Sequence, residues 1–323
     1  MASPRSVLVV IVNFNSGPLL TKSVACVKAQ TDADWRLVVV DNASSDDSVS
    51  QMLSRYPDVD VLRAGKNLGF AAANNLAVRS RPATRWVALL NPDAFPEPDW
   101  LQRLVEAAEA HPQFGAFASC TLSAADPALM DGAGDAYHLS GRYWRRGNLR
   151  PRSERYARSA EVFSACAAAA LYSRAAWDQV TGMDEDYFCY GEDVDLGFRL
   201  QLAGHRCLYV PNAIAFHEGS AVTGRRSDFS TYYGQRNLVW TFVKNMPPLL
   251  FWTLLPYHIM LNLGALAACL LRGQAGVAFR AKLDALRMIP REWRKRASIQ
   301  RGRRVTTNEV WRMLEGGWPR PGS

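Results

Sequence analysis

The first 120 residues alternate between continuous apolar runs and segments with helical spacing. The runs are rich in β-branched residues and read VLVVIVN (7–13), WRLVVVD (35–41), VDVLR (59–63), RWVALLN (85–91) and, more weakly, FGAFASC (114–120). Four helix-like segments lie between or beside them: 18–29, 46–55, 69–79 and 98–110. Continuous apolar strands separated by helices predict an α/β fold, in which helices cover both faces of a mostly parallel central sheet.

The pattern changes in the next part of the chain. Residues 123–160 are rich in glycine, arginine and aromatic residues and have no clear period, which predicts a long loop or lid. The segments that follow predict, in order, a strand and then a helix (163–182), a helix (191–205) and two short strands (207–220). The second half of the predicted domain is therefore less regular than the first.

Residues 249–271 form a long apolar segment that contains no Asp, Glu, Lys or Arg. Its length would allow it to span a bilayer. Three residues that suit a span poorly lie inside it: Pro256, His258 and Asn262. Basic residues flank both ends, so a single span would place one of them against the positive-inside rule. An in-plane or re-entrant membrane segment is favoured, while a true span and a buried or dimerising helix, and with it a homodimer, remain open.

The positive charge of the chain is concentrated behind this segment. Eleven lysines and arginines lie between Arg272 and Arg304 against two acids, whereas the whole chain has a formal net charge of +8. A basic tail can bind an anionic membrane surface or a nucleic acid. No nucleic-acid-binding pattern accompanies it, so the membrane surface is the predicted partner.

Hydrophobic residues make up 48% of the chain, which suits one large domain with an appendage. The expected parts are a domain of residues 1–245, divided into a first half (1–120) and a second half (121–245), and a membrane-associating helical region with a basic tail (246–323). The six cysteines are scattered and form no CxxC pair, which predicts reduced thiols in the cytoplasm. The run SVLVVIVNFN is short and ends in polar residues, so it is expected to be a strand and not a signal peptide.

Polar side chains follow the ends of the predicted strands. They are Asn13 and Asn15, Asp41 and Asn42, and Asn91 and Asp93. Ligands of parallel sheets bind at the carboxyl ends of the strands, so we examined each set as a candidate site. Asp41 could accept a hydrogen bond from a ligand such as a pyrimidine, or its segment could simply begin a helix. The stretch GKNLG (65–69) could hold an anion at a helix N-terminus or form a plain turn.

Two further motifs suggest chemistry. Asp93 in NPD is an oxygen ligand suited to a hard cation, although Asn-Pro and Pro-Asp also mark turns. His217 ends another apolar run and could complete a metal site with Asp93. Glu192, Asp193 and Asp195 cluster in an aromatic setting, where a partly desolvated carboxylate is a good general base. The alternative is that these acids stabilise a helix N-terminus.

Taken in order, these motifs resemble family 2 glycosyltransferases of the GT-A (Rossmann-like) fold, in particular their bacterial rhamnosyltransferase-like branch. The resemblance covers about residues 5–245 and rests on VNFN, VDNASSD, GKNLGFAAANN, LLNPDA, GMDEDYFCYGEDVDLGFRLQLAG and FHEGS. It implies the inverting transfer of a sugar from a nucleotide-diphosphate donor to a hydroxyl of an acceptor. Residues 1–120 would then be the nucleotide-binding half of the domain, and residues 121–245 the acceptor and catalytic half.

The resemblance also implies roles for single residues. Asp193 would be the catalytic base, with Glu192 beside it. The residues implied on the donor side are Asn13, Asn15, Asp41, Asn42, Lys66, Asn67, Gly69, Asn91, Asp93 and Arg236. Asp93 and His217 would hold a divalent cation, Mg²⁺ or Mn²⁺. The acceptor side would include Asp131, Trp144 and Arg145 of the expected lid.

The sequence departs from the family pattern at Asn91, which stands where the Asp-x-Asp motif has its first acid. The rhamnosyltransferase-like branch shares this Asn-x-Asp form, which favours dTDP-rhamnose as the donor. The implied enzyme transfers L-rhamnose to a lipid-linked or other cell-surface polysaccharide precursor, a glycan or polyprenyl-linked acceptor, at the inner face of a bacterial cell membrane. No nucleic acid is expected as a partner.

Three other interpretations were considered. The donor could be a different nucleotide sugar, such as a UDP-sugar. A nucleotidyltransferase usually has a Gly-rich basic loop after its first strand, and NFNSGPLL lacks the basic residues. An inactive nucleotide-sugar-binding scaffold would not need the acids and the histidine at positions 93, 193 and 217.

Overall fold

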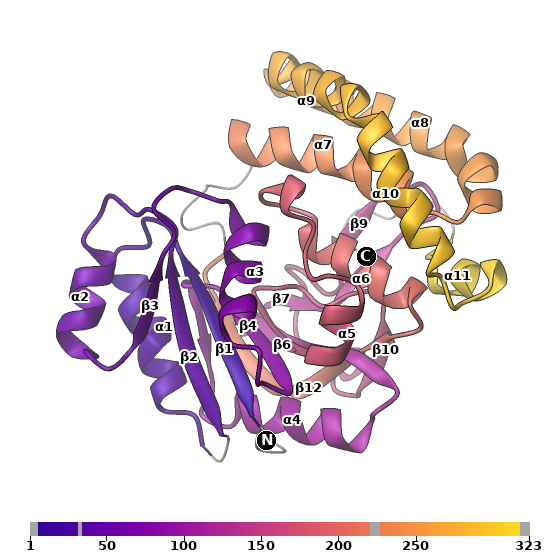
Figure 1. Ribbon diagram of the computed structural model, residues 1–323. Helices are drawn as coiled ribbons and strands as arrows, with labels where there is room; N and C mark the ends of the chain where they lie inside the picture. Colours follow the sequence, from indigo (N-terminus) through magenta and orange to yellow (C-terminus); the bar gives the residue numbers. More distant parts are fainter. Residues whose placement is uncertain (1–5, 32–33, 220–226, 317–323) are drawn as a thin grey trace.

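The computed structural model describes residues 6–31, 34–219 and 227–316. A central sheet lies between two layers of helices, and the C-terminal helices gather above one end of it (Figure 1). The predicted α/β fold is confirmed.

The main sheet has the strand order β10-β12-β6-β11-β4-β1-β2-β3, and β5 and β7 pair with β12 and β6. Its strands are β1 (Val7–Asn13), β2 (Trp35–Asp41), β3 (Asp60–Arg63), β4 (Trp86–Leu90), β5 (Ala94–Pro96), β6 (Phe114–Ser123), β7 (Met130–Ala133), β10 (Ala160–Val162), β11 (Ala169–Ser173) and β12 (Arg206–His217). Strands β1–β4 pair in parallel, as predicted for the first 120 residues. Strand β11 enters antiparallel between β4 and β6, which makes the second half mixed.

Alternate residues of β1 belong to two different apolar cores, one on each face of the sheet. Leu8 and Val10 pack on one face with helices α3 (Phe70–Ser80), α5 (Arg174–Gln179) and α6 (Glu192–Leu202). Val9 and Ile11 pack on the other face with helices α1 (Pro18–Lys28), α2 (Ser48–Arg55) and α4 (Trp100–Ala110). The continuous apolar runs are therefore explained by burial on both faces of the sheet.

Two sequence-based expectations need correction. Residues 123–160 are not one long loop, because they contain β7, the strand pair β8 (Asp135–Tyr137) and β9 (Tyr143–Arg145), and a 3₁₀ turn, η1 (Glu154–Tyr156). The described part of 207–220 belongs to a single strand, β12, with a register shift against β6 between Val210 and Ile214. Pro211 lies at that shift, and proline removes a backbone donor and is tolerated at such irregularities. Ser220 lies outside the described residues.

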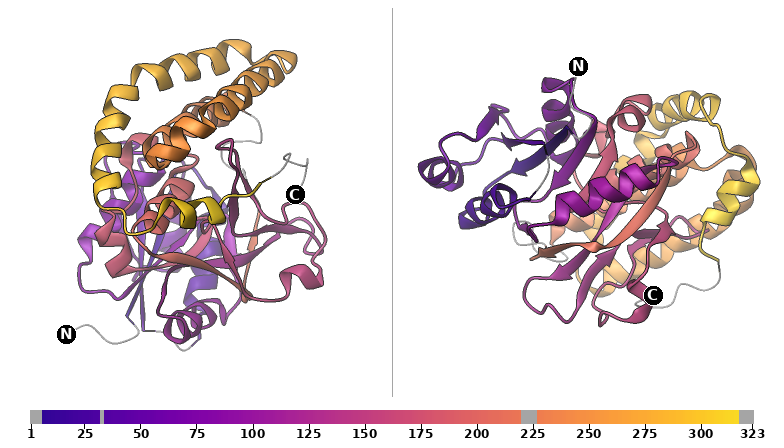
Figure 2. Two further views of the ribbon diagram at one scale, coloured as in Figure 1. Left: turned by 90° about the vertical axis from the view of Figure 1, so that its right-hand side faces the viewer. Right: turned by 90° about the horizontal axis from the view of Figure 1, so that it is seen from below.

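The C-terminal helices are α7 (Asp228–Asn245), α8 (Pro248–Leu271), α9 (Ala275–Arg287), α10 (Ile289–Arg301) and α11 (Thr307–Met313). Figure 1 and the left view of Figure 2 show α7–α10 stacked together above the sheet. A third apolar core joins them to the rest of the protein and includes Tyr187, Phe198, Trp240 and Phe251. The helical region is thus packed against the second half of the domain.

Candidate active site

A cleft of about 480 Å³ opens at the carboxyl ends of β1 and β4. The sheet, the start of α3, the strand pair β8–β9 and the start of α6 each contribute to its walls. The predicted site residues that line it are Asn42, Asn67, Gly69, Asn91, Asp93, Trp144, Arg145, Glu192, Asp193 and His217. The structure therefore brings together residues that lie up to 175 positions apart in sequence.

One wall is built by the amides of Asn42 and Asn67. The Nδ2 group of Asn42 donates to Oδ1 of Asn67 at 2.9 Å, and its Oδ1 accepts from the backbone N–H of Leu68 at 2.8 Å. Gly69 has φ of +81°, and a Cβ there would lie 2.5 Å from the ring of Phe188. GKNLG is therefore a fixed loop that contacts the opposite wall, which only glycine at position 69 permits. Lys66 is exposed and is not among the residues that line the cleft.

Three predicted donor residues brace the loop after β2 and are not among those that line the cleft. Asn13 donates to the hydroxyl oxygens of Ser44 and Ser48, both at 2.9 Å. Asn15 accepts from the backbone of residues 45 and 46. Asp41 accepts from the backbone N–H of Ser44 at 3.0 Å and pairs with the side chain of residue 63 at 3.2 Å. These contacts hold the shape of the loop after β2.

Asn91, Asp93 and His217 form a second polar group, which we call the strand-end cluster. Strand β5 pairs antiparallel with the end of β12, with Ala94 opposite His217, and this pairing brings NPD next to the histidine. His217 Nε2 lies 3.3 Å from Oδ1 of Asp93 and 3.4 Å from Nδ2 of Asn91. The predicted proximity of Asp93 and His217 is thus present in the structure.

Asp131 lies behind this cluster and orients the histidine. Its Oδ2 is 2.9 Å from Nδ1 of His217 and 2.6 Å from a guanidinium nitrogen of Arg145. Burial lowers the pKa of His217, but hydrogen bonds to Asp131 and Asp93 outweigh it and raise the pKa above its ordinary value. Burial also opposes ionisation of Asp131, yet Arg145 and His217 hold the pKa of that carboxyl well below its usual range. Asp131 thus fixes Nδ1 and leaves Nε2 facing Asp93.

The strand-end cluster suits a divalent cation by the chemistry of its donors. A carboxylate, an amide and an imidazole nitrogen face one another, and the remaining ligands of Mg²⁺ or Mn²⁺ are commonly water or phosphate oxygens. Within the described residues there is no group of three or more His, Cys, Asp and Glu side chains that could hold a metal by itself. The residues therefore fit an ion that shares its coordination with a phosphate-bearing substrate.

The opposite wall carries the acids at the start of α6. Asp193 accepts two backbone hydrogen bonds, from Ala167 at 3.2 Å and from Val194 at 2.8 Å, and lines the cleft. Glu192 is buried, and burial together with Asp193 raises the pKa of its carboxyl well above the ordinary value. Asp195 points away from the cleft and pairs with Arg199 at 2.8 Å. The acidic cluster thus divides into two cleft acids and one structural acid.

Asp135 is a cleft residue that sequence reasoning missed. It lies on β8, lines the cleft and accepts from the hydroxyl of Ser164 at 3.0 Å. Burial and the nearby Asp193 raise its pKa to about 8, so the carboxyl is largely protonated at neutral pH. Its signal in the sequence is weak, because the segment around it has no period and predicts a loop.

Arg236 lies on α7 and is not among the residues that line the cleft. Its guanidinium donates to the carbonyl oxygens of Asp186 and Tyr187, both at 2.9 Å. The same group lies 4.1 Å from the ring centre of Trp240. In the structure Arg236 therefore supports the wall of the cleft from behind.

Comparison with known proteins identifies the family. Residues 8–181 match the model of the family described as glycosyl transferase family 2. The N-acetylglucosaminyl-diphospho-decaprenol L-rhamnosyltransferase of Mycobacterium tuberculosis is 33% identical over 239 residues, which cover 67% of this chain and 77% of the relative. The rhamnosyltransferase WbbL of Escherichia coli is 28% identical over 224 residues, 65% of this chain and 83% of the relative.

Two solved structures resemble the fold. The mannosyltransferase PcManGT of Pyrobaculum calidifontis, solved with GDP-mannose and Mn²⁺, has a TM-score of 0.55 at 20% identity, covering 97% of this chain and 88% of its own. GalNAc-T7, solved with UDP, GalNAc and Mn²⁺, has a TM-score of 0.60 at 16% identity, covering 74% of this chain and 48% of its own. With the family match, the motifs and the cleft, this chain belongs to glycosyltransferase family 2, whose members are nucleotide-sugar-dependent enzymes.

Proposed function

We propose that the protein is an inverting rhamnosyltransferase that moves L-rhamnose from dTDP-rhamnose to a hydroxyl of a lipid-linked glycan precursor. The observation that carries this proposal is a single cleft with two different walls. One wall carries the strand-end cluster, which suits a cation and a diphosphate. The other wall carries the half-buried carboxylate of Asp193. The names of the mycobacterial and Escherichia coli relatives support the sugar, and the name of the mycobacterial relative supports the acceptor class.

On the donor wall, Asn42 and Asn67 would contact the nucleoside, and Asp93 and His217 would hold a divalent cation with the diphosphate. When bound, the cation neutralises the negative charge that develops on the leaving diphosphate. Asn91 brings an amide but no charge, so the protein supplies only one carboxylate to the ion. Affinity for the ion is then expected to depend on the phosphates of the donor.

On the opposite wall, Asp193 would act as the general base. The acceptor oxygen attacks the anomeric carbon, the bond from that carbon to the diphosphate oxygen breaks, and the acceptor proton passes to the carboxylate of Asp193. Two backbone N–H groups hold this carboxylate in place, which favours a fixed direction of attack. One carboxylate is enough for inversion, because no covalent enzyme intermediate is needed.

Aromatic side chains at the mouth of the cleft would receive the acceptor. Phe188, Tyr190 and Phe229 line the cleft, and Phe229 is 39% exposed. Tyr233 stacks on Phe188 with ring centres 5.1 Å apart. Trp144 lines the cleft from the β8–β9 side. Aromatic faces with a few polar groups between them are common in ligand sites.

The membrane would be contacted by α8 and α9. Within the described residues, α8 is the one helix long and apolar enough to cross a membrane, and 17% of its apolar window is buried. Large apolar side chains of the two helices are exposed: Leu249, Trp252, Tyr257, Ile259, Met260, Leu263, Leu270, Leu271, Phe279, Leu283 and Leu286. Such an apolar surface is large for a protein in water and suits the interfacial region of a bilayer.

The polar residues inside α8 favour attachment along the membrane plane. His258 stacks on Phe242 with ring centres 4.0 Å apart and bonds the carbonyl of Ser140 at 2.8 Å. Asn262 bonds Lys282 of α9 at 2.5 Å. These contacts bind one side of the helix to the protein and leave the other side for lipid. Arginines near the apolar surface would add attraction to anionic lipids of the cytoplasmic leaflet.

A donor panel tests this proposal. Purified full-length protein is incubated with dTDP-rhamnose, UDP-glucose, UDP-N-acetylglucosamine and GDP-mannose, and with a short-chain prenyl-diphosphate-linked N-acetylglucosamine as acceptor. We expect product with dTDP-rhamnose. In that product the anomeric carbon of the transferred sugar should have the configuration opposite to that in the donor. Product with a UDP-sugar only would show that the proposed donor is wrong. Binding of a nucleotide sugar without any transfer would favour the inactive scaffold.

A further inference from the structure

The wall that carries Glu192 and Asp193 begins with an irregular segment, residues 184–191, which we call the wall segment. It contains a short 3₁₀ turn, η2 (Glu185–Tyr187), and then Phe188, Tyr190 and Gly191 with φ of 65°, 67° and 82°. Non-glycine residues rarely adopt a positive φ, which costs about 1–3 kcal/mol. At Phe188 ψ is −63°, and the N–H of Cys189 donates to the carbonyl oxygen of Tyr187 at 2.7 Å, which makes a strained γ-turn. A segment of this kind keeps its shape only if the surrounding structure holds it.

Helix α7 holds the backbone of the wall segment. The Nδ2 group of Asn237 lies within hydrogen-bond distance of the carbonyl oxygens of Tyr187, Cys189 and Tyr190, at 3.1, 2.9 and 2.7 Å. Arg236 bonds the carbonyls of Asp186 and Tyr187 from the same helix. The carbonyl groups of the irregular turns are thus satisfied by side chains from outside the segment.

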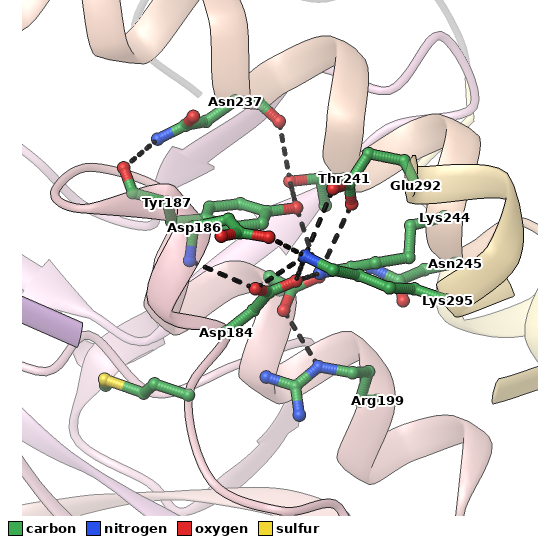
Figure 3. A network of polar contacts seen from close by, with 12 residues as sticks. Asp184, Asp186, Tyr187, Arg199, Asn237, Thr241, Lys244, Asn245, Glu292 and Lys295 are labelled. Carbon is green, nitrogen blue, oxygen red and sulfur yellow. Dashed lines mark hydrogen bonds and ion pairs between the residues drawn. The ribbon is translucent and has the colours of Figure 1, made fainter. Parts of the chain in front are cut away.

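Helix α10 holds the side chains of the same segment. Lys295 Nζ lies 2.7 Å from Oδ2 of Asp184 and 2.6 Å from Oδ2 of Asp186 (Figure 3). Lys244 of α7 lies between Asp184 at 2.5 Å and Asp195 of α6 at 2.8 Å. The network therefore joins α10, the wall segment and the helix that starts with the two cleft acids.

This network lies largely out of water. Lys244 and Asp195 are fully buried, and Asp184 and Lys295 are 13% and 26% exposed in their side chains. Buried ion pairs often add little net stability, because desolvation offsets the attraction. Their geometry is nevertheless strict, since a displaced partner leaves a buried charge unpaired. The arrangement suits positioning better than it suits stabilisation.

We propose that Lys295 is a positioning residue, through which α10 fixes the wall segment and so sets the place of Glu192 and Asp193 in the cleft. This inference rests on the proposed function only for its kinetic consequence. Helix α10 follows α8 and α9 in the chain. With Lys295 in this role, the C-terminal region supports the active site in addition to making the proposed membrane contact. Deleting residues 247–323 would therefore remove a support of the active site, and it is not a clean test of membrane binding.

The test compares Lys295→Ala with Lys295→Arg and with Arg294→Ala in the full-length protein. Arg294 is exposed on the same helix, and its removal changes the net charge equally. Amide hydrogen exchange is measured on peptides that cover 184–191 and, as an internal reference, β1 and β2. We expect faster exchange in 184–191 for Lys295→Ala, partial or full protection for Lys295→Arg, and no change for Arg294→Ala.

Kinetics are measured in detergent with a short-chain acceptor, which removes any contribution from membrane binding. We expect Lys295→Ala to lower kcat about tenfold, because small misplacements of reacting groups are costly. The KM for the donor should change less than kcat, because the strand-end cluster lies on the other wall, although Phe188 of the wall segment contacts Gly69 of the donor side. Lys295→Arg should restore most of kcat, and Arg294→Ala should behave as wild type.

A double-mutant cycle separates positioning from a general loss of stability. The combined effect of Asp186→Asn and Lys295→Ala on kcat should be smaller than the sum of the two single effects, because the two changes share one contact. Some additional loss is expected, since Asp186 also pairs with Arg291 and Lys295 also pairs with Asp184. Unchanged exchange in 184–191 and unchanged kcat for Lys295→Ala would overturn the proposal. So would a loss of activity that is explained entirely by a smaller folded fraction.

The exchange measurement also separates this proposal from the proposed function. If wild-type protein transferred no sugar but Lys295→Ala still loosened residues 184–191, the positioning of the wall would stand and the proposed reaction would fail. If wild-type protein were active and neither exchange nor kcat responded to Lys295→Ala, only the positioning role would fail.

Discussion

The two walls of the cleft are held in place by different means. The donor wall is built from the ends of strands of the main sheet and from hydrogen bonds near them, such as Asn42 to Asn67, and His217 joins it from β12. The wall with Glu192 and Asp193, which we call the acid wall, is held by side chains of α7 and α10, about 50 to 110 residues further along the chain. The donor wall is therefore fixed by strand order and strand pairing, whereas we expect the acid wall to need the docked C-terminal helices.

The largest effect is expected at the buried lysine of the acid wall. Lys244→Met would remove the buried cation that Asp184 and Asp195 share. Each acid would keep one further basic partner, Lys295 for Asp184 and Arg199 for Asp195. Removing one partner of a buried ion pair costs about 3–5 kcal/mol, and the remaining partners place the expected loss near the lower end, about 3 kcal/mol. We expect a loss of this size in the free energy of unfolding, measured by urea denaturation, whereas Lys28→Met on the surface of the donor half should change it little. Equal stability of the two variants would contradict the comparison.

The next largest effect is expected for the strand-end cluster. Asp93→Ala should lower kcat/KM by about 10²–10³, as for the loss of a group that stabilises a developing charge. Asp93→Asn keeps the size of the side chain and should be nearly as impaired, because the charge is what the ion requires. Chelation should reduce wild-type activity, and Mg²⁺ or Mn²⁺ should restore it. Full activity in the presence of a chelator would leave Asp93 and His217 in need of another role.

A smaller effect is expected at the amide pair of the donor wall. Asn42→Ala removes two hydrogen bonds that shape the GKNLG loop, at a cost of roughly 1–2 kcal/mol. We expect the KM for the donor to rise about tenfold while kcat changes little. The contrast with Lys295→Ala, which should act on kcat, would sharpen the difference between the walls. A fall in kcat with an unchanged donor KM would show that the donor wall also positions the acceptor.

The smallest effect on catalysis is expected at the apolar surface. Leu263→Glu on the exposed face of α8 should weaken co-sedimentation with vesicles that contain anionic lipid, because it places a charge at the bilayer interface. Activity in detergent should remain as in wild type. Leu149→Glu, an equally exposed change on the sheet domain, is the matched control and should leave vesicle binding unchanged. Unchanged vesicle binding of Leu263→Glu would show that the membrane contact does not involve this face of α8.

Much of the donor half was predictable from the sequence. Continuous apolar runs marked β1, β2 and β4, and the polar residues after them indicated an edge of the sheet where Asp93 and His217 meet. These sequence patterns are local. They are easy to recognise because both faces of each strand are buried, which makes the strands continuously apolar. Which polar residues line the cleft was not predictable, since the side chains of Asn13, Asn15 and Asp41 bond the loop after β2.

The acid wall was predictable only in its residues and not in its geometry. Glu192, Asp193 and Asp195 look alike in sequence, and only the direction of α6 decides which of them faces the cleft. Asp135 had no periodic signal, and the contacts of Arg236 and Lys295 to the wall segment join residues about 50 to 110 positions apart. Long-range contacts of this kind depend on the docking of whole helices, which the local pattern does not specify.

The central claim is that Asp193 is the base on the acid wall, and one variant tests it most directly. Asp193→Asn keeps the size of the side chain and much of its hydrogen bonding but cannot take the acceptor proton. We expect transfer from dTDP-rhamnose to fall by at least about 10²–10⁴, the usual range for a general base, while calorimetry finds the same affinity for the donor. Turnover near the wild-type rate in Asp193→Asn would contradict the account.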